Sequence, residues 1–245
     1  MLSKNNIKFV QGLCQKKTSA LHQLFIIEGD KIISELLSQN SYKLHTLYYT
    51  ATWAATQIFT HIPNNYIQIS EGEMVQLTNM QSAPNVLAVV HYNAPTALPN
   101  ANDELILCLY NLQDPGNLGS IIRTANWFGI KHIVCTSNTV NAYNFKVVQA
   151  SMGSILRLTL HYTSVDKYIL SHAGVPIYAA TLQGVNYTTV PKCKKGILVI
   201  GNEGNGLPIE LITNCTEQIS IPKIGNAESL NASVATGILL AHFCS

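Results

Sequence analysis

Charged side chains are scarce in this sequence: aspartate, glutamate, lysine and arginine together make up 11% of the residues. Long apolar runs are absent too, because no segment reaches the roughly 18 uninterrupted apolar residues that a membrane-spanning helix needs. The six cysteines form no C-x-x-C pair, and the eight histidines form no H-x-x-x-H pair and no cluster with cysteine. We therefore expect no membrane span and no metal site, and we expect the cysteines to be buried, reduced thiols.

Hydrophobic residues make up 47% of the sequence, which excludes a disordered chain and is typical of a compact protein. Residues 1–17 contain four lysines and lack the apolar block of a signal peptide, so we expect a cytoplasmic location. The formal net charge of +2 is far below that of a non-specific nucleic-acid coat. An RNA partner would therefore have to be held by local basic groups. The candidate phosphate contacts are Lys4, Lys8, Lys16, Lys17, Lys146 and Arg157.

Residues 91–103 divide the sequence, because they hold two prolines and three asparagines and apolar periodicity fades there. We expect a smaller domain at 1–92, a linker at 93–103 and a larger domain at 104–245. In the first part the predicted strands are Phe25–Ile27, Leu44–Tyr49, Tyr66–Ile69 and Val86–Val90, the predicted helices are Lys31–Leu37 and Ala51–Gln57, and Ser70 with Glu73 predicts a capping box.

The part after the linker shows a stronger alternation of strands and helices. The predicted strands are Leu105–Tyr110, His132–Cys135, Leu156–Leu160, Ile177–Ala180 and Ile197–Ile200, and the predicted helices are Leu118–Phe128 and Asn231–Phe243. This alternation predicts an α/β fold with a mostly parallel sheet and helices on both faces.

Three segments rich in glycine and asparagine are expected at the carboxyl ends of strands in the second part, where open α/β sheets bind their ligands. The first is N-L-Q-D-P-G-N-L-G-S-I-I-R-T-A-N-W-F-G, residues 111–129. It predicts a turn at Asp114-Pro115-Gly116 and a helix that begins near Asn117. Arg123 lies on that helix, where a surface cation with a buried stem is the alternative to a functional role.

The second segment is V-I-G-N-E-G-N-G-L-P, residues 199–208. Its glycines let the backbone approach a ligand closely, but a tight turn explains them as well. Glu203 argues against a phosphate or dinucleotide cradle, because an acid is a poor neighbour for a phosphate. Pro208 predicts the start of the next helix.

The third segment is I-P-K-I-G-N-A-E-S-L-N-A-S-V-A-T-G, residues 221–237. Ser229 or Asn231 can cap the final helix. Capping explains one of these residues but not the whole polar run that enters an apolar helix.

In this order and spacing, the three segments resemble the motifs of the SpoU–TrmH class of RNA ribose 2′-O-methyltransferases, and the resemblance covers residues 103–245. The first part is similar to the L30e-like substrate-binding domain that often precedes this catalytic domain, with F-I-I-E-G-D-K at residues 25–31 as its hallmark. Members of the class usually carry an arginine before that hallmark, whereas this sequence has Lys16 and Lys17.

The resemblance implies a SPOUT-type fold, in which the parallel-sheet domain contains a deep trefoil knot, preceded by the smaller L30e-like α/β domain. It also implies S-adenosylmethionine as cofactor, no metal, and a homodimer with the active site near the subunit interface. By motif position, the implied cofactor-binding residues are Gly201, Ile221 and Leu230, together with the strand end at Thr181, Leu182 and Gln183.

The implied catalytic residues are Asn117, Arg123, Glu203, Ser229 and Asn231. Arg123 is implicated in activating the ribose 2′-hydroxyl. Because an arginine is always protonated, orienting an RNA phosphate is physically the easier role, and both roles stay open. Asn117 would orient Arg123 or the ribose, and the other three would shape the pocket.

The two-domain layout favours ribosomal RNA over transfer RNA, by analogy alone. Two functions of other classes are weighed against this prediction. A non-catalytic RNA-binding module would be expected to show decayed motifs, and all three are intact. A dehydrogenase would need G-x-G-x-x-G after an early strand, whereas the glycines here occur late in the sequence.

Overall fold

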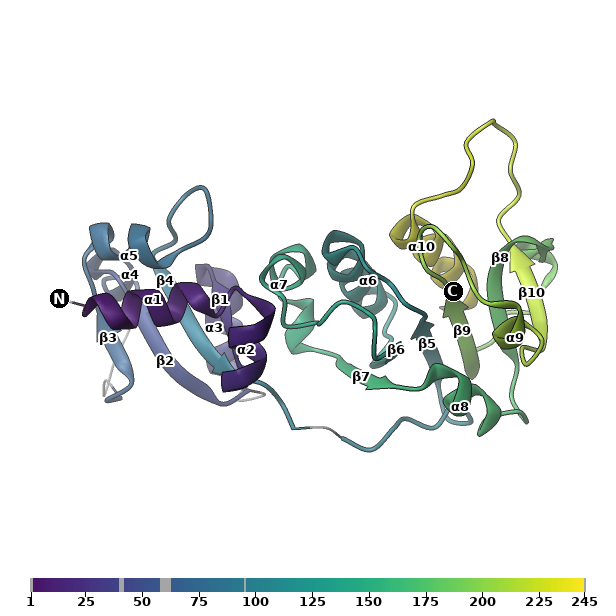
Figure 1. Ribbon diagram of the computed structural model, residues 1–245, viewed down its shortest axis with the longest axis horizontal. Helices are drawn as coiled ribbons and strands as arrows, with labels where there is room; N and C mark the ends of the chain where they lie inside the picture. Colours follow the sequence, from purple (N-terminus) through teal and green to yellow (C-terminus); the bar gives the residue numbers. More distant parts are fainter. Residues whose placement is uncertain (1, 40–41, 58–62, 95, 245) are drawn as a thin grey trace. The chain divides into compact units, whose positions relative to one another are not determined.

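The computed structural model describes residues 2–39, 42–57, 63–94 and 96–244 (Figure 1). Its contacts divide the chain into a first unit, Met1–Ala94 with Tyr143–Leu156, and a second unit, Pro95–Ala142 with Arg157–Ser245. The division after residue 94 falls inside the predicted linker. The segment Tyr143–Leu156 differs from the predicted division, which assigned it to the larger domain.

The first unit contains a four-stranded sheet with the order β1 (Leu24–Glu28), β4 (Val86–His91), β2 (Leu44–Tyr49) and β3 (Tyr66–Gln68). Strand β4 runs antiparallel to both of its neighbours, and β3 runs parallel to β2. All four strands predicted for this part of the sequence are confirmed, with nearly the predicted ends.

The helices of the first unit are α1 (Lys4–Gly12), α2 (Lys16–His22), α3 (Asp30–Gln39), α4 (Ala51–Ala54), α5 (Glu71–Leu77) and α7 (Phe145–Ser151), followed by the 3₁₀ turn η1 (Ser154–Leu156). Helices α1 and α2 had no counterpart in the sequence prediction. The capping box at the start of α5 is confirmed: the Ser70 amide donates to the Glu73 carboxylate at 2.9 Å, and the Glu73 amide donates to the Ser70 hydroxyl at 3.2 Å.

Aromatic rings hold the segment Tyr143–Leu156 in the first unit. The ring of Tyr143 lies 4.1 Å from that of Tyr92 and 4.6 Å from that of Phe25, measured between centroids. The hydroxyl of Tyr42 donates to the Ile155 carbonyl at 3.2 Å. A tyrosine that follows a loop in the sequence carries no sign of such distant partners, so sequence periodicity did not predict this packing.

The second unit contains a six-stranded sheet with the order β10 (Glu217–Ser220), β8 (Ile177–Asn186), β9 (Gly196–Ile200), β5 (Leu105–Leu109), β6 (His132–Thr136) and β7 (Thr159–Thr163). Every neighbouring pair is parallel, which confirms the predicted parallel sheet.

The strand predicted at Leu156–Leu160 is wrong in its position. Leu156 ends η1, and its amide donates to the Gly153 carbonyl at 3.0 Å, closing a turn in which Gly153 has a φ of 89°. The strand itself, β7, begins at Thr159. One apolar run spans the two elements, and periodicity alone does not separate a short strand from a helical turn.

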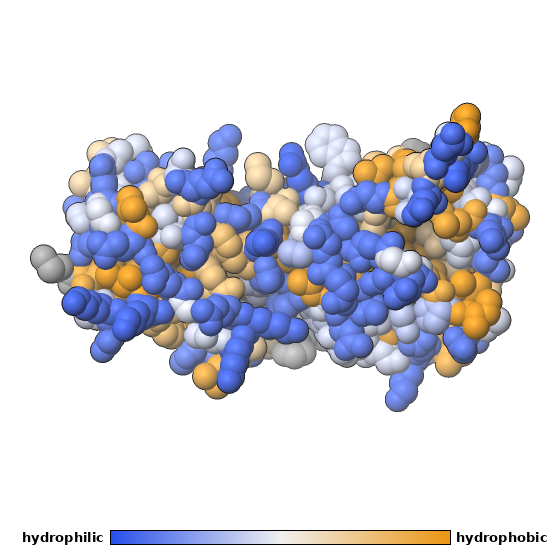
Figure 2. All heavy atoms as spheres, turned by 45° about the horizontal axis from the view of Figure 1, so that its top comes forward, coloured by the Kyte–Doolittle hydropathy of each residue, from blue (hydrophilic) through white to orange (hydrophobic). Residues whose placement is uncertain are grey.

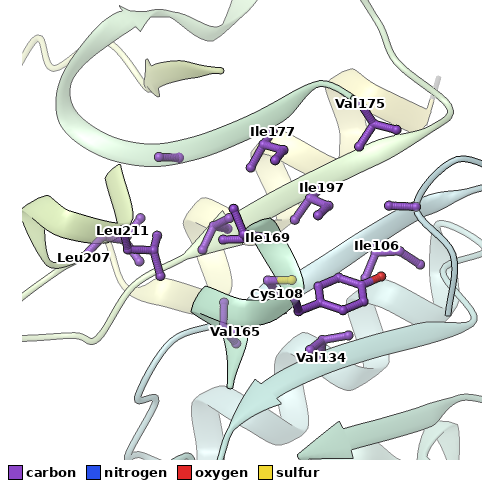
Figure 3. Close-up of a cluster of buried hydrophobic side chains, with 14 residues drawn as sticks. Ile106, Cys108, Val134, Val165, Ile169, Val175, Ile177, Ile197, Leu207 and Leu211 are labelled. Atoms are coloured by element: carbon purple, nitrogen blue, oxygen red, sulfur yellow. The ribbon is translucent and has the colours of Figure 1, made fainter. Parts of the chain in front are cut away.

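Helices cover both faces of the second sheet. They are α6 (Pro115–Trp127), α8 (Val165–Leu170), α9 (Ile209–Ile212) and α10 (Ala232–Cys244), and a 3₁₀ turn, η2 (Tyr187–Thr189), follows β8. On one face, Ile169 of α8 and Leu211 of α9 lie in a buried cluster with alternate strand residues such as Ile106 and Ile197 (Figure 3). On the other face, α6 packs on α10, whose Phe243 ring lies 4.8 Å from the Tyr178 ring.

The connections of the second sheet reverse direction between two neighbouring strands. From β5 the chain leads through α6 to β6 on one side, and from β9 it leads through α9 to β10 on the other side. Ligands of open α/β sheets bind beyond the carboxyl ends of the strands at such a switch point. The loops that follow β5 and β9 are therefore where a ligand site is expected.

None of the helices in the described part of the chain is long and apolar enough to cross a membrane. All six cysteines are free thiols, as expected. Only Cys108 and Cys135 are fully buried, and the other four are half-buried, so the expectation of burial holds for two of the six.

Glu28, in the F-I-I-E-G-D-K segment, carries a buried carboxylate without a hydrogen-bond donor among the described residues. Burial raises the pKa of Glu28 above its ordinary value of 4.5; Thr78 and the Asn79 backbone lie near enough to oppose part of this rise. Neither of these groups reaches hydrogen-bond geometry. Burial, together with the nearby Glu28 carboxylate, raises the pKa of the Cys14 thiol to about 12.

We expect Glu28→Gln to stabilise the protein at neutral pH. A raised pKa in the folded state means that stability falls as the pH rises from 4.5 through the folded-state pKa, because only the unfolded chain ionises freely there. The expected gain is the free energy by which burial disfavours the ionised Glu28 carboxylate in the folded state. Thermal melts should give a higher melting temperature for the variant than for the wild type at neutral pH. This difference should shrink toward pH 4.5. The same charge change at the exposed Glu228 is the control, and a gain for Glu28→Gln that did not depend on pH would contradict this account.

Candidate active site

Three loops at the carboxyl edge of the second sheet contain the predicted motifs. The first runs from the end of β5 into α6, the second follows β9 at residues 201–208, and the third follows β10 at residues 221–231. The third loop is exposed almost throughout and extends away from the rest of the second unit (Figure 1).

Helix α6 begins two residues earlier than predicted, at Pro115. Asp114 is the N-cap, and its carboxylate accepts the Asn117 amide at 2.7 Å. Proline at the first helical position is favourable because the missing N–H has no partner within the helix there. This start places Asn117 in the first turn of the helix, beside the loop that follows β9.

A chain of side-chain hydrogen bonds joins all three motif segments. The Asn117 amide nitrogen donates to the Glu203 carboxylate at 3.0 Å, and the Asn231 amide nitrogen donates to the Asn117 oxygen at 2.8 Å. Three of the five predicted catalytic residues, separated by up to 114 positions in sequence, therefore lie in direct contact.

The Glu203 carboxylate binds the start of α6 through two further bonds. It accepts the backbone amides of Gln113 and Asp114, each at 3.3 Å. With Asn117, it accepts from three donors on the loop after β5. A carboxylate engaged in this way holds two loops together, and most of its acceptor capacity is already used.

Asn231 has two roles at once. Its side-chain oxygen accepts the Ser233 amide at 2.8 Å and the Val234 amide at 3.4 Å, so it caps α10, while its nitrogen reaches Asn117. The capping role considered for Ser229 is not seen, since within the described chain the Ser229 hydroxyl makes no hydrogen bond.

Arg123 is exposed on α6, between the buried Ile122 and the half-buried Thr124. Its guanidinium forms no hydrogen bond or ion pair with any part of the chain that the structure describes. An arginine anchored by a buried helix but unpaired at its tip is available to bind an external anion such as an RNA phosphate.

At Gly201 the backbone of residues 206 and 207, in the same loop, approaches too closely for a side chain to fit. A Cβ at this position would be 2.5 Å from the Gly206 carbonyl carbon and 2.8 Å from the Leu207 nitrogen. The amides of Asn202 and Gly206 each donate to the other's carbonyl, at 3.1 and 3.0 Å, which closes the loop into a tight hairpin. The glycine is thus required by the turn, whether or not a ligand binds.

Thr181 offers the clearest fit to the cofactor that the motifs imply. Its hydroxyl oxygen is buried and has no partner among the described residues. A buried hydroxyl without a partner costs free energy, and an S-adenosylmethionine polar group at this edge would satisfy it. Thr181 lies on β8, two residues after Ala179, which pairs with Val199 of β9, and Gly201 lies two residues after Val199.

The other predicted cofactor residues are more exposed. Strand β8 continues to Asn186 rather than ending at Ala180 as predicted, so Thr181, Leu182 and Gln183 lie within a strand. The extension exists because β10 pairs with it, and Gly184 permits this pairing: a Cβ there would be 2.4 Å from the Gln218 backbone. Ile221 and Leu230 lie in the loop that follows β10, and Leu230 is 46% exposed.

The site contains residues that the sequence prediction did not single out. Asn111 has a positive φ of 55°, Gln113 donates its amide to Glu203, and Asn202 bonds the Asn111 carbonyl at 2.7 Å. All three lie inside the quoted motifs. An asparagine at the end of a strand, before a turn, was the available signal for the left-handed conformation.

Comparisons with known proteins match both parts of the chain. Residues 104–241 match the model of the SpoU rRNA Methylase family, and residues 4–88 match the model of the MRM3-like substrate binding domain. A similar curated protein is the 23S rRNA (guanosine(2553)-2′-O)-methyltransferase RlmP of Bacillus subtilis. It is 29% identical over 96% of this chain and 94% of its own length.

Solved structures with the same fold cover nearly the whole chain. A TrmH-family protein from Porphyromonas gingivalis superposes with a TM-score of 0.88 at 31% identity, over 99% of this chain and 98% of the other. An AdoMet-bound rRNA methyltransferase from Sinorhizobium meliloti gives a TM-score of 0.84 at 28% identity, over 99% and 95% of the two chains.

Proposed function

The chain belongs to the SpoU rRNA methylase family and is an S-adenosylmethionine-dependent RNA 2′-O-methyltransferase, and from this premise we propose that its substrate is ribosomal RNA. The observation that best supports the methyltransferase activity is the hydrogen-bonded contact of Asn117, Glu203 and Asn231. It joins three motif segments at the switch point of the sheet. The name of the Bacillus subtilis relative, which aligns over nearly the whole chain, supports ribosomal RNA over transfer RNA.

Methyl transfer to a ribose oxygen requires that the 2′-hydroxyl be held in line with the donor and lose its proton. When bound, S-adenosylmethionine supplies the electrophilic methyl group and a sulfonium leaving group. The protein's tasks are therefore to bind both partners, to orient the ribose and to help remove one proton.

The contacts favour different roles for the polar residues of the site. Arg123, unpaired and exposed, would bind the phosphate next to the target ribose and stabilise the developing oxyanion. Asn117, Glu203 and Asn231 have their side chains committed to each other and would position the start of α6. Ser229 keeps a free hydroxyl within the described chain and would hydrogen-bond the substrate.

The cofactor would be held at the carboxyl ends of three adjacent strands. Thr181 and Gly201 lie on or after β8 and β9, and Ile221 follows β10. The buried, unpartnered Thr181 hydroxyl supports this placement. The loop from Ile221 to Leu230 would close one side, in the deep trefoil knot that we propose for this domain.

We also propose a homodimer formed through α6 and α10. The sequence of α10, A-S-V-A-T-G-I-L-L-A-H-F-C, is apolar around its whole circumference, although one side of a surface helix is normally polar. Trp127 of α6 is 84% exposed and Val234 of α10 is 49% exposed. Figure 2 shows apolar atoms interrupting the hydrophilic surface around α10. Exposed apolar area of this kind is typical of a protein interface.

We expect Trp127→Glu to convert the dimer to a monomer. A buried, unpaired carboxylate at an interface costs several kcal/mol, which is enough to dissociate a dimer at micromolar concentration. Sedimentation analysis measures the oligomeric state directly. The matched control is Leu170→Glu, because Leu170 is 57% exposed on α8, on the opposite face of the sheet. A wild type that sediments as a monomer would overturn the proposed interface.

The proposed substrate is tested by incubating the protein with labelled S-adenosylmethionine and total RNA that lacks the modification. Label in one ribosomal RNA species is the expected result. Label in the transfer RNA fraction would keep the chemistry and overturn the proposed substrate. DNA should remain unlabelled even when it binds, because it lacks the 2′-hydroxyl.

A further inference from the structure

Asn111 has an unusual backbone conformation at the carboxyl end of β5. Its φ of 55° lies in the left-handed region, which costs residues other than glycine roughly 1–2 kcal/mol and which asparagine tolerates better than most. Strained residues of this kind persist only where their surroundings hold them, and they cluster at functional sites.

Four hydrogen bonds from three segments hold Asn111, and one of them runs from the Gln113 side-chain nitrogen to the Asn111 carbonyl at 3.2 Å. Its amide donates to the Thr136 hydroxyl at 2.8 Å, at the end of β6. Its carbonyl accepts the side-chain nitrogen of Asn202 at 2.7 Å, and its side-chain oxygen accepts that of Gln113 at 2.9 Å. The residue is thus fixed by β6, by the loop after β9 and by its own loop at once.

Asn202 supplies the bond that crosses the switch point. Its side-chain oxygen accepts the amides of Gly204 and Asn205 at 2.9 and 3.0 Å, which shapes the glycine-rich loop. Its side-chain nitrogen is left for the Asn111 carbonyl. The two ends of one amide therefore do two things: the oxygen folds the loop, and the nitrogen ties it to the loop after β5. The next residue along the chain is Glu203.

We propose that Asn111 and Asn202 are positioning residues for methyl transfer. The bond between them sets the spacing of the two loops so that Glu203 reaches Asn117, and Asn117 in turn fixes the start of the helix that carries Arg123. This inference rests on the proposed roles of Asn117 and Arg123 in the reaction. A displacement of about 1 Å at reacting groups can lower a rate about 100-fold, so a remote tie of this kind is expected to act on turnover.

The test variant is Asn202→Asp. Aspartate keeps the oxygen that accepts the Gly204 and Asn205 amides, so the glycine loop retains its shape, but it has no donor for the Asn111 carbonyl. We expect kcat to fall about 100-fold while KM for RNA and the dissociation constant of S-adenosylhomocysteine stay as in the wild type. A purely structural role would instead lower the melting temperature and raise both KM for RNA and the dissociation constant of S-adenosylhomocysteine.

The control with the same charge change is Asn100→Asp. Asn100 lies in the second unit and uses only its side-chain oxygen, which accepts the Asn102 amide at 3.1 Å, so kcat should not change. Asn111→Gly and Asn111→Ala form a second pair, since both keep the backbone groups but only glycine adopts a positive φ freely. We expect Asn111→Ala to lose about tenfold in kcat and Asn111→Gly to restore most of it.

Hydrogen exchange separates this inference from the proposed function. The backbone amides of Gln113 and Asp114 donate hydrogen bonds to the Glu203 carboxylate. In Asn202→Asp these amide hydrogens should exchange with solvent faster than in the wild type, with or without an RNA substrate. Unchanged exchange at these amides, or unchanged kcat with an active wild type, would overturn the positioning role. A wild type that fails to methylate any RNA while exchange does respond would instead overturn the proposed function alone.

Discussion

Replacing Arg123 with alanine is expected to lower methyl transfer by about 10²–10³-fold, the loss that removal of one donor to a developing oxyanion usually causes. The guanidinium is exposed and unpaired within the described chain, so its loss removes no contact of the fold. Surface substitutions of this kind change stability by no more than about 0.5 kcal/mol. Binding of S-adenosylhomocysteine should therefore survive, because the proposed cofactor residues lie on β8 and in the loops after β9 and β10, not on α6.

The companion variant Arg123→Lys distinguishes a point charge from a planar donor. Lysine keeps the charge but loses the paired N–H groups that match a phosphate, so partial activity is expected. Single-turnover experiments measure the rate of methyl transfer, and calorimetry measures the affinity for S-adenosylhomocysteine. Near-normal turnover in Arg123→Ala would show that another group orients the ribose.

Replacing Gly201 with alanine should have the opposite signature, a loss of cofactor binding. The added Cβ would lie 2.5 Å from the Gly206 carbonyl carbon, inside a backbone hairpin that cannot yield by moving a side chain. Overpacking of this kind typically costs about 1–3 kcal/mol. The added Cβ is expected to push the hairpin open, and cofactor binding would then have to supply the energy that closes it. Affinity for S-adenosylhomocysteine should therefore fall roughly tenfold to 100-fold.

Gly204→Ala in the same loop is the control. A Cβ there meets only the Asn202 side-chain oxygen, at an ordinary 3.6 Å. Binding by calorimetry should stay as in the wild type for Gly204→Ala and weaken for Gly201→Ala. Equal affinities in both variants would place the cofactor elsewhere than at this loop.

The sequence contained enough local information to predict most strands and the identity of the site segments. Buried parallel strands such as Leu105–Leu109 and Gly196–Ile200 are short apolar runs between turns, and that pattern is specific. The motif order also identified Asn117, Glu203 and Asn231 as candidates, and the structure brings these three into contact.

The failures share a physical cause: they depend on partners far away in sequence. Strand β8 extends to Asn186 only because β10 pairs with it, and the sequence of the segment itself does not predict that extension. Tyr143 joins the first unit through the rings of Phe25 and Tyr92, which lie more than 50 positions earlier in sequence. The left-handed conformation of Asn111 likewise depends on Thr136, at the end of β6, and on Asn202, in the loop after β9.

The role of each site residue was harder to predict than which residues form the site. Glu203 was expected to shape the pocket, yet its carboxylate accepts two backbone amides and one side chain of the neighbouring loop. Such a pattern becomes visible only when the two loops lie side by side. The sequence shows which residue types are present, and the geometry shows which of their donors and acceptors are already used.

The most direct test of the central claim is to identify the atom that receives the methyl group. Ribosomal RNA labelled by the wild type from tritiated S-adenosylmethionine should be digested with alkali, which cleaves next to a free 2′-hydroxyl but not next to a methylated one. The account predicts that the label is found in an alkali-resistant dinucleotide, and that Arg123→Ala gives none. Label recovered in mononucleotides would show methylation of a base, and would contradict a site built to act on the ribose.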